Sequence, residues 1–166
     1  KLEILSPQER QFFVHEINQT AKPYPAEKCM HQIFEERVDA QPDDTAVSMP
    51  ALQGADRKSA YTYRELDRAA NKLANYLRGK GVSPEDKVGI CVHRSPEMII
   101  AILGILKAGG AYVPLDPEYP RGRINYIAED AGLKFVLTQK EADDRLPEEG
   151  LDRIYLDDDW PRIAEM

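Results

Sequence analysis

An almost wholly apolar segment near the middle of the chain most constrains its fold. Residues 98–106 are all apolar or glycine, and Ser95 and Pro96 before them are typical of a helix N-cap and first turn. A helix that is apolar all round is buried on more than one side. We therefore expect residues 95–107 to form such a helix, capped by Ser95. Where this chain leaves the helix bare, we expect self-association or a tight contact with another chain.

Short apolar runs alternate with helical patterns around this segment. Residues 88–92 form a continuous apolar run, which is typical of a strand covered on both faces. Thr62 and Glu65 form a capping-box pair for a helix that Gly79 is expected to end. Further elements are a helix at 121–131 and strands at 111–115, 135–137 and 154–156. The pattern predicts an α/β fold of layered βαβ units with a mostly parallel sheet.

The N-terminal sixty residues follow a different pattern. Ser6, Pro7 and Glu9 predict a short helix that ends near Asn18. Two closely spaced prolines then favour an extended linker over residues 19–25.

A second helix is predicted at residues 26–40, followed by strands at 45–49 and 60–62 that form a hairpin around a polar loop. The buried face of this helix is expected to consist of Met30, Ile33, Phe34 and Val38.

The charge of the chain is uneven. The formal net charge is −7, and residues 141–159, with nine acidic and two basic side chains, account for all of it. Without a basic stripe, neither duplex nucleic acid nor an anionic membrane is an expected partner. No apolar run is long enough to span a bilayer, and residues 1–20 do not resemble a signal peptide. With Cys29 and Cys91 as the only cysteines, a disulfide framework is excluded, and we expect a cytoplasmic protein.

The residue patterns alone show no catalytic or metal site. The glycine pair at 109–110 follows a helix instead of opening one, which indicates a helix stop and not a phosphate loop. The Cys-x-His pairs at 29–31 and 91–93 lack the spacing of zinc sites, and no serine lies in a nucleophile motif. The acidic run at 157–159 is interpreted as a solvated surface, since consecutive carboxylates point in different directions.

Several stretches of the sequence are nevertheless similar to one enzyme family. Residues 106–117, LKAGGAYVPLDP, resemble the second core motif of the amino-acid adenylation domains of nonribosomal peptide synthetases. Residues 61–66, YTYREL, resemble the first core motif, with Tyr61 where leucine is usual. Residues 5–25 resemble the linker between a condensation domain and the adenylation domain. Similar text is also found at 73–78, 94–98 and 116–120.

The resemblance implies that residues 1–25 are a linker from an upstream condensation domain. Residues 26–166 would then be the incomplete N-terminal part of an adenylation domain, with the N-terminal subdomain fold of adenylate-forming enzymes. In that family the complete domain uses ATP and Mg²⁺ to convert an amino acid into aminoacyl-AMP, and loads it onto the phosphopantetheine thiol of a carrier domain. The rest of the adenylation domain, the condensation domain and the carrier domain are the implied partners.

The resemblance also implies that the catalytic parts lie elsewhere. The family's phosphate loop, specificity pocket, ribose-binding aspartate and catalytic lysine follow the two core motifs found here. We therefore assign no catalytic, cofactor-binding or metal-binding residue to this chain, and expect no cofactor and no catalysis from it alone. Lys107 is a poor phosphate ligand, because it is expected at a helix C-terminus, where the helix dipole is negative.

Two alternatives stay open. A truncated, non-catalytic adenylation-like module, acting as a scaffold or docking surface in a biosynthetic assembly line, would share every residue of this chain. An independent small nucleotide-binding α/β domain is disfavoured by the missing phosphate loop.

Overall fold

The computed structural model, which describes residues 4–50 and 59–166, centres on a four-stranded parallel sheet. The strand order is β4-β3-β5-β6. The strands are β3 (Lys87–Cys91), β4 (Ala111–Pro114), β5 (Phe135–Thr138) and β6 (Asp152–Tyr155). The predicted α/β class and parallel sheet are therefore confirmed.

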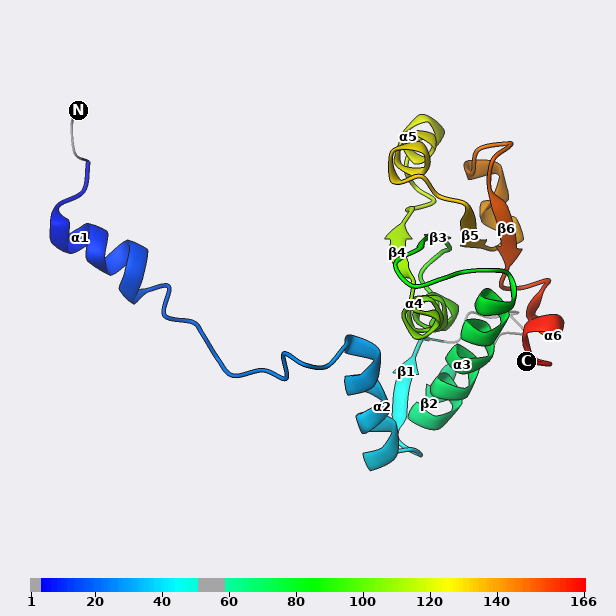
Figure 1. Ribbon diagram of the computed structural model, residues 1–166, viewed down its shortest axis with the longest axis horizontal. Helices are drawn as coiled ribbons and strands as arrows, with labels where there is room; N and C mark the ends of the chain where they lie inside the picture. The colour runs from blue at the N-terminus through cyan, green and yellow to red at the C-terminus, as the bar shows by residue number, and fades with distance from the viewer. Residues whose placement is uncertain (1–3, 51–58) are drawn as a thin grey trace.

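Helices cover both faces of the sheet (Figure 1). Helix α5 (Arg121–Ala131) lies on one face, and the pair α3 (Tyr63–Gly79) and α4 (Pro96–Ala108) lies on the other. Alternate strand residues serve the two layers: Val88 packs with α3 and α4, whereas Val136 packs with α5.

The contact between α3 and α4 is close because α4 carries a glycine where the helices meet. A Cβ atom at Gly104 would lie 2.7 Å from Leu73 Cδ2 of α3, which is too near for any side chain. The predicted apolar face of α3, which includes Leu66 and Leu77, is buried in this layer. Helix α4 is buried on more than one side as predicted, although Met98 and Ile102 remain partly exposed.

An ion network around a buried lysine joins three helices beside this contact. The Lys107 side chain of α4 is only 4% exposed and forms an ion pair with Glu35. Its ammonium also lies 2.8 Å from Asp67 Oδ1 of α3, as an electrostatic contact without hydrogen-bond geometry. Because Glu35 belongs to α2 (Met30–Ala40), the network fastens α2 to the α3–α4 layer.

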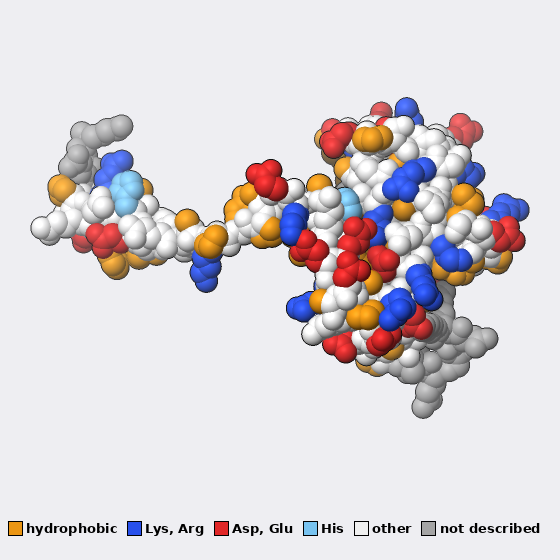
Figure 2. All heavy atoms as spheres, turned by 60° about the horizontal axis from the view of Figure 1, so that its bottom comes forward, with side chains coloured by type: hydrophobic (Ala, Val, Ile, Leu, Met, Phe, Trp, Pro, Cys, Tyr) orange, Lys and Arg blue, Asp and Glu red, His pale blue; other side chains and the backbone are white. Residues whose placement is uncertain are grey.

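The N-terminal segment lies apart from the sheet and its helices (Figure 1). Helix α1 (Pro7–Gln11) has the predicted capping box and continues as a π-helical segment, η1 (Phe12–Glu16). The Asn18 amide closes this segment by donating to the Phe13 and Val14 carbonyl oxygens, each at 3.0 Å. Every described residue before His31 is exposed, and the linker that follows Asn18 has no helix or strand, as predicted. Figure 2 shows this segment as a projection with apolar side chains on its surface.

The predicted start of α2 is wrong by four residues. The helix begins at Met30 and not at Ala26, because Cys29 is extended and acts as the N-cap. The Cys29 N–H donates to Gln32 Oε1 at 2.8 Å, which closes the first turn there. Met30 is 69% exposed, so its predicted burial is also wrong, whereas Ile33, Phe34 and Val38 are half-buried.

The remaining elements complete the chain. Strands β1 (Thr45–Ser48) and β2 (Ala60–Thr62) pair antiparallel, which confirms the hairpin, and most of its predicted polar loop lies outside the described residues. The 3₁₀ segment η2 (Lys140–Arg145) precedes β6, and helix α6 (Trp160–Ile163) follows it. Within the described ranges, no helix is long and apolar enough to cross a bilayer.

The predicted N-caps of α3 and α4 differ in outcome. Thr62 Oγ1 accepts from the Glu65 N–H at 3.3 Å, and Glu65 Oε2 accepts from the Thr62 N–H at 3.0 Å, which confirms the capping box of α3. Ser95 occupies the N-cap position of α4 but makes no cap hydrogen bond, and its Oγ atom is buried without a partner. The predicted N-cap position of Ser95 is therefore confirmed, whereas its hydroxyl does not cap the helix.

Replacing Thr62 tests the capping box against a matched control. Thr62→Ala is expected to lower the free energy of unfolding by about 1 kcal/mol, measured by urea denaturation, because the Glu65 N–H loses its acceptor. Ser95→Ala removes a hydroxyl that satisfies nothing, so it should leave the midpoint unchanged or raise it slightly. Equal losses in the two variants would contradict this account of the helix starts.

The Lys107 network can be tested by removing its charge while keeping its apolar stem. Lys107→Met should lower the free energy of unfolding by about 2 kcal/mol, because Asp67 then stays partly buried without its cation. The double variant Lys107→Met/Asp67→Leu should recover part of that loss. Arg68→Met, at an exposed position of the same helix as Asp67, serves as the control and should be neutral; a neutral Lys107→Met would show that the network does not fasten the helices.

Candidate functional site

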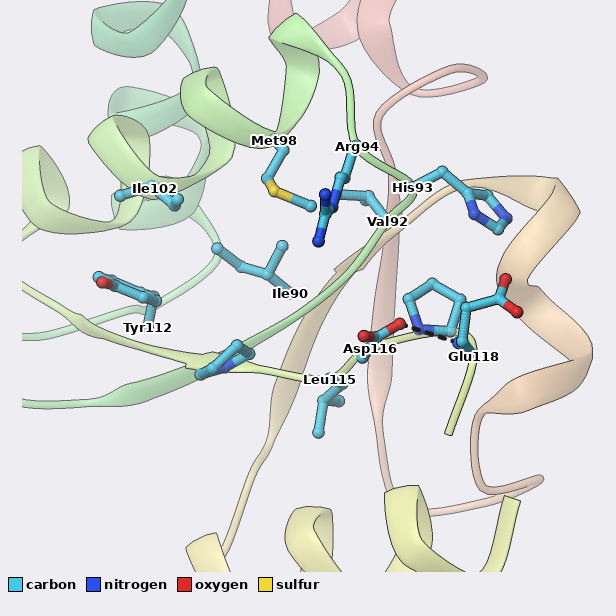
Figure 3. A pocket seen from close by; sticks show the side chains of 12 residues that line it. Ile90, Val92, His93, Arg94, Met98, Ile102, Tyr112, Leu115, Asp116 and Glu118 are labelled. Carbon is cyan, nitrogen blue, oxygen red and sulfur yellow. Dashed lines mark hydrogen bonds between the residues drawn. The ribbon is translucent and has the colours of Figure 1, made fainter. Parts of the chain in front are cut away.

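A cavity of about 500 Å³ opens at the carboxyl ends of β3 and β4 (Figure 3). Its wall comes from the two strands, from the first two turns of α4, and from the loop that follows β4. Most of its lining is apolar and includes Ile90, Met98, Ile102, Tyr112 and Leu115.

The topology of the sheet puts this cavity at the edge where α/β proteins bind ligands. Strand β3 is flanked by β4 on one side and β5 on the other. The connections that follow β3 and β5 therefore add their next strands on opposite sides of the sheet. Ligands of open α/β sheets bind outside the carboxyl ends of the strands near such a reversal. The Gln139 side chain, which is buried beyond β5, accepts from the His93 N–H at 3.4 Å and holds the two strand ends together.

Charged groups surround the mouth of the cavity. Arg94 follows β3, and its guanidinium extends toward Met98 in Figure 3. Asp116 and Glu118 lie on the opposite loop, where Asp116 Oδ1 accepts from the Glu118 N–H at 2.9 Å and shapes the turn. The site thus combines an apolar floor with one guanidinium and two carboxylates.

These groups do not fit a nucleoside triphosphate. Arg94 is the one Lys or Arg side chain among the described residues of the lining, and two carboxylates share the mouth with it. A triphosphate needs several oriented amides and cations, which this apolar wall does not offer.

The glycine pair serves the helix stop that the sequence predicts. Gly109 has φ = 95°, a left-handed conformation, and ends α4. A Cβ atom at Gly110 would lie 3.0 Å from the Asp86 backbone oxygen, so the chain passes too close to Asp86 for a side chain there. Both glycines are explained by the backbone path between α4 and β4.

The structure brings none of the predicted metal candidates together. Cys91 is fully buried beneath α5, and burial, together with the charge of Asp116, raises the pKa of its thiol to about 11. It is therefore a protonated core residue at neutral pH. Cys29 is exposed at the start of α2. In the described parts of the chain, no three His, Cys, Asp or Glu side chains are placed to hold a metal ion.

The acidic run at the end of the chain is engaged in local contacts. Asp157 accepts from the Lys140 N–H at 3.0 Å, and Asp158 Oδ2 lies 2.5 Å from Lys140 Nζ. Asp159 accepts from the Tyr155 N–H at 2.9 Å. Asp157 and Asp158 thus contact different atoms of Lys140, and Asp159 contacts Tyr155, so the three carboxylates do not converge on one point.

Sequence reasoning missed Arg94 as a feature of the site. Its position directly after an apolar strand and before a helix start was the available signal, since that is where carboxyl-end loops lie. That position alone does not predict a cavity, because Tyr112, which lies on the opposite wall, belongs to a different strand.

Comparison with known proteins places the whole arrangement in a family. The profile of the family described as "AMP-binding enzyme" matches residues 34–164. Gramicidin S synthase 2 of Brevibacillus brevis is 45% identical over 159 residues, which are 96% of this chain and 3% of that protein. The chain therefore spans only a small fraction of such relatives.

Two solved structures extend the likeness to the fold. The nonribosomal peptide synthetase FmoA3, in its α-methyl-L-serine-AMP-bound form, superposes with a TM-score of 0.78 at 36% identity over 95% of this chain and 17% of that chain. The N-terminal subdomain of Klebsiella oxytoca NpsA superposes with a TM-score of 0.68 at 25% identity over 83% of this chain and 32% of that chain.

The family profile covers well over half of the chain, and the fold superposes on these two structures. The chain thus belongs to the AMP-binding enzymes, and it corresponds to the N-terminal adenylation region of nonribosomal peptide synthetases.

Proposed function

We propose that this chain is the N-terminal part of an adenylation domain whose complete form activates an amino acid. In that reaction the amino-acid carboxylate attacks the α-phosphorus of ATP, and aminoacyl-AMP forms as pyrophosphate leaves. A carrier-domain phosphopantetheine thiol then takes the acyl group and releases AMP. Mg²⁺ and the carrier thiol are parts of the proposal.

One observation carries the proposal: the 45% identity with gramicidin S synthase 2 extends over nearly the whole chain. Its support comes also from FmoA3, a relative solved with an aminoacyl-AMP bound. Within this picture the present chain supplies architecture, because its glycines, caps and ion network fix the helices and strands and its cavity does not suit ATP.

The N-terminal segment is proposed as the linker from a condensation domain, as far as residue 25. The FmoA3 match covers 95% of the chain. This is more than the residues after Cys29 make up, so the match includes residues of this segment. Its apolar side chains, such as Phe12 and Phe13, are about half exposed and make no core of their own. A segment of this kind suits a contact with a neighbouring domain.

A chimaeric domain tests the proposed function. This chain replaces the 159 matched residues of gramicidin S synthase 2 in one complete adenylation domain of that protein, and amino-acid-dependent exchange of pyrophosphate into ATP is measured. We expect exchange with the amino acid of the parent domain, because the specificity pocket is proposed to lie outside this chain. A folded chimaera without exchange would favour the non-catalytic scaffold instead.

The chain by itself should give no exchange with pooled proteinogenic amino acids. Preorganised cations and amides around the phosphates supply much of the rate of such reactions, and the described residues offer no such cluster. Lys107 cannot replace them, because its ammonium is buried against Glu35 and Asp67. Exchange above a protein-free blank that is lost in Lys107→Met would overturn this assignment.

A further inference from the structure

Helix α2 is attached to the rest of the fold by half-buried side chains. No residue of α2 is fully buried, whereas α3 buries six residues. The apolar side chains of α2, which are Ile33, Phe34 and Val38, are half-buried, and the centroid of the Phe34 ring lies 5.9 Å from that of Tyr63 in α3. An element with so little buried apolar surface is among the first parts of a fold to open.

The C-terminal end of α2 is tied to the start of α3 by backbone hydrogen bonds. Directly after the helix, the Arg64 N–H donates to the Pro42 carbonyl oxygen at 2.9 Å, and the Tyr63 N–H donates to the Asp44 carbonyl oxygen at 3.0 Å. At the other end, residues 4–29 are all exposed, and their hydrogen bonds to described residues stay within this segment or reach α2 itself. The linker leads away from the sheet (Figure 1). This arrangement leaves a hinge at one end of α2 and an unattached segment at the other.

The two carboxylates that face the Lys107 ammonium differ in how firmly they are held. Asp67 belongs to α3, its side chain is 19% exposed, and its Oδ2 accepts from Asn71 Nδ2 of the same helix at 2.9 Å. The Glu35 side chain, on α2, is 46% exposed, and Lys107 is its one ionic partner among the described residues. If Glu35 moves away, Lys107 keeps the carboxylate of Asp67. Opening of α2 therefore does not leave a buried cation unpaired.

We propose that α2 is a hinged flap that closes on the α3–α4 layer and is latched by the ion pair between Glu35 and Lys107. In the closed state, Glu35 and Asp67 share the ammonium. In the open state, α2 swings about Gln41 and carries residues 4–29 with it, while Asp67 holds Lys107 in the layer and the sheet stays folded. The direction in which the N-terminal segment leaves the fold is thus controlled by one ion pair.

Amide hydrogen exchange of the whole chain, resolved by element, tests the flap. The amides of α2 should exchange at least about tenfold faster than those of α3, relative to their intrinsic rates, because α2 opens without the rest of the fold. Once undocked, a helix of eleven residues is unstable in water, so its amides lose their protection. Equal protection of α2 and α3 would mean that the two open together, and would overturn the proposal.

Charge variants test the latch. Glu35→Gln keeps the size of the side chain and removes its charge, so exchange in α2 should rise about fivefold while α3 and the sheet stay unchanged. Glu36→Gln is the matched control on the same helix, because Glu36 pairs with Lys28, which moves with the flap. Asp67→Asn should raise exchange in α3 and α4 as well, since it removes the carboxylate that stays with Lys107. Unchanged exchange of α2 in Glu35→Gln would contradict the latch.

Thiol labelling gives a second readout of the same opening. Val38→Cys, in a Cys29→Ser background, places a thiol at a half-buried position of α2, and Glu35→Gln should raise its rate of reaction with a maleimide about as much as it raises exchange. Tyr126→Cys, at a 67% exposed position of α5, should react equally with and without Glu35→Gln. Faster exchange without faster labelling would mean that α2 frays in place, and would overturn the proposal. None of these measurements requires ATP or an amino acid, so their outcome is separate from that of the proposed function.

Discussion

The close packing of α3 on α4 is the contact on which the rest of this structure depends. Gly104 lets Leu73 approach the α4 backbone, and the two helices then form one layer over the sheet. Lys107 sits in the same layer and gathers carboxylates from α2 and α3. Burying a lysine is unfavourable unless its charge is compensated, so the network specifies one arrangement of the three helices. The core motif that contains Lys107, Gly109 and Gly110 is therefore explained by architecture.

The same layer determines what the carboxyl edge of the sheet can do. Because α4 connects the carboxyl end of β3 to the start of β4, its first turns form one wall of the cavity at the strand ends. That wall is apolar, and the charges at the mouth do not suit a triphosphate. The close contact at Gly104 and the ion network around Lys107 hold the helices behind this wall in one arrangement.

Much of the fold could be predicted from local patterns. The capping pair Thr62–Glu65, the apolar face of α3 and the glycine stop of α4 all depend on residues within a few positions of one another. The errors came where a distant or alternative contact decided. At α2 the hydrogen bond from the Cys29 N–H to Gln32 Oε1 places the helix start at Met30. At α4 the Ser95 hydroxyl lies at the N-cap but has no backbone partner. The site was less predictable than the fold, since Arg94 and Tyr112 come from different strands.

The sequence by itself determined the order of the main helices and strands, the parallel α/β class and the family, because periodicity, caps and motifs are properties of short stretches of chain. Only the tertiary structure decided that Lys107 is a buried structural cation, that Gly104 is the point of helix contact and that Arg94 faces an apolar cavity. Each of these depends on side chains that are distant in sequence and meet only after the chain has folded. The energies involved arise from burial and from pairing across elements, which no local pattern records.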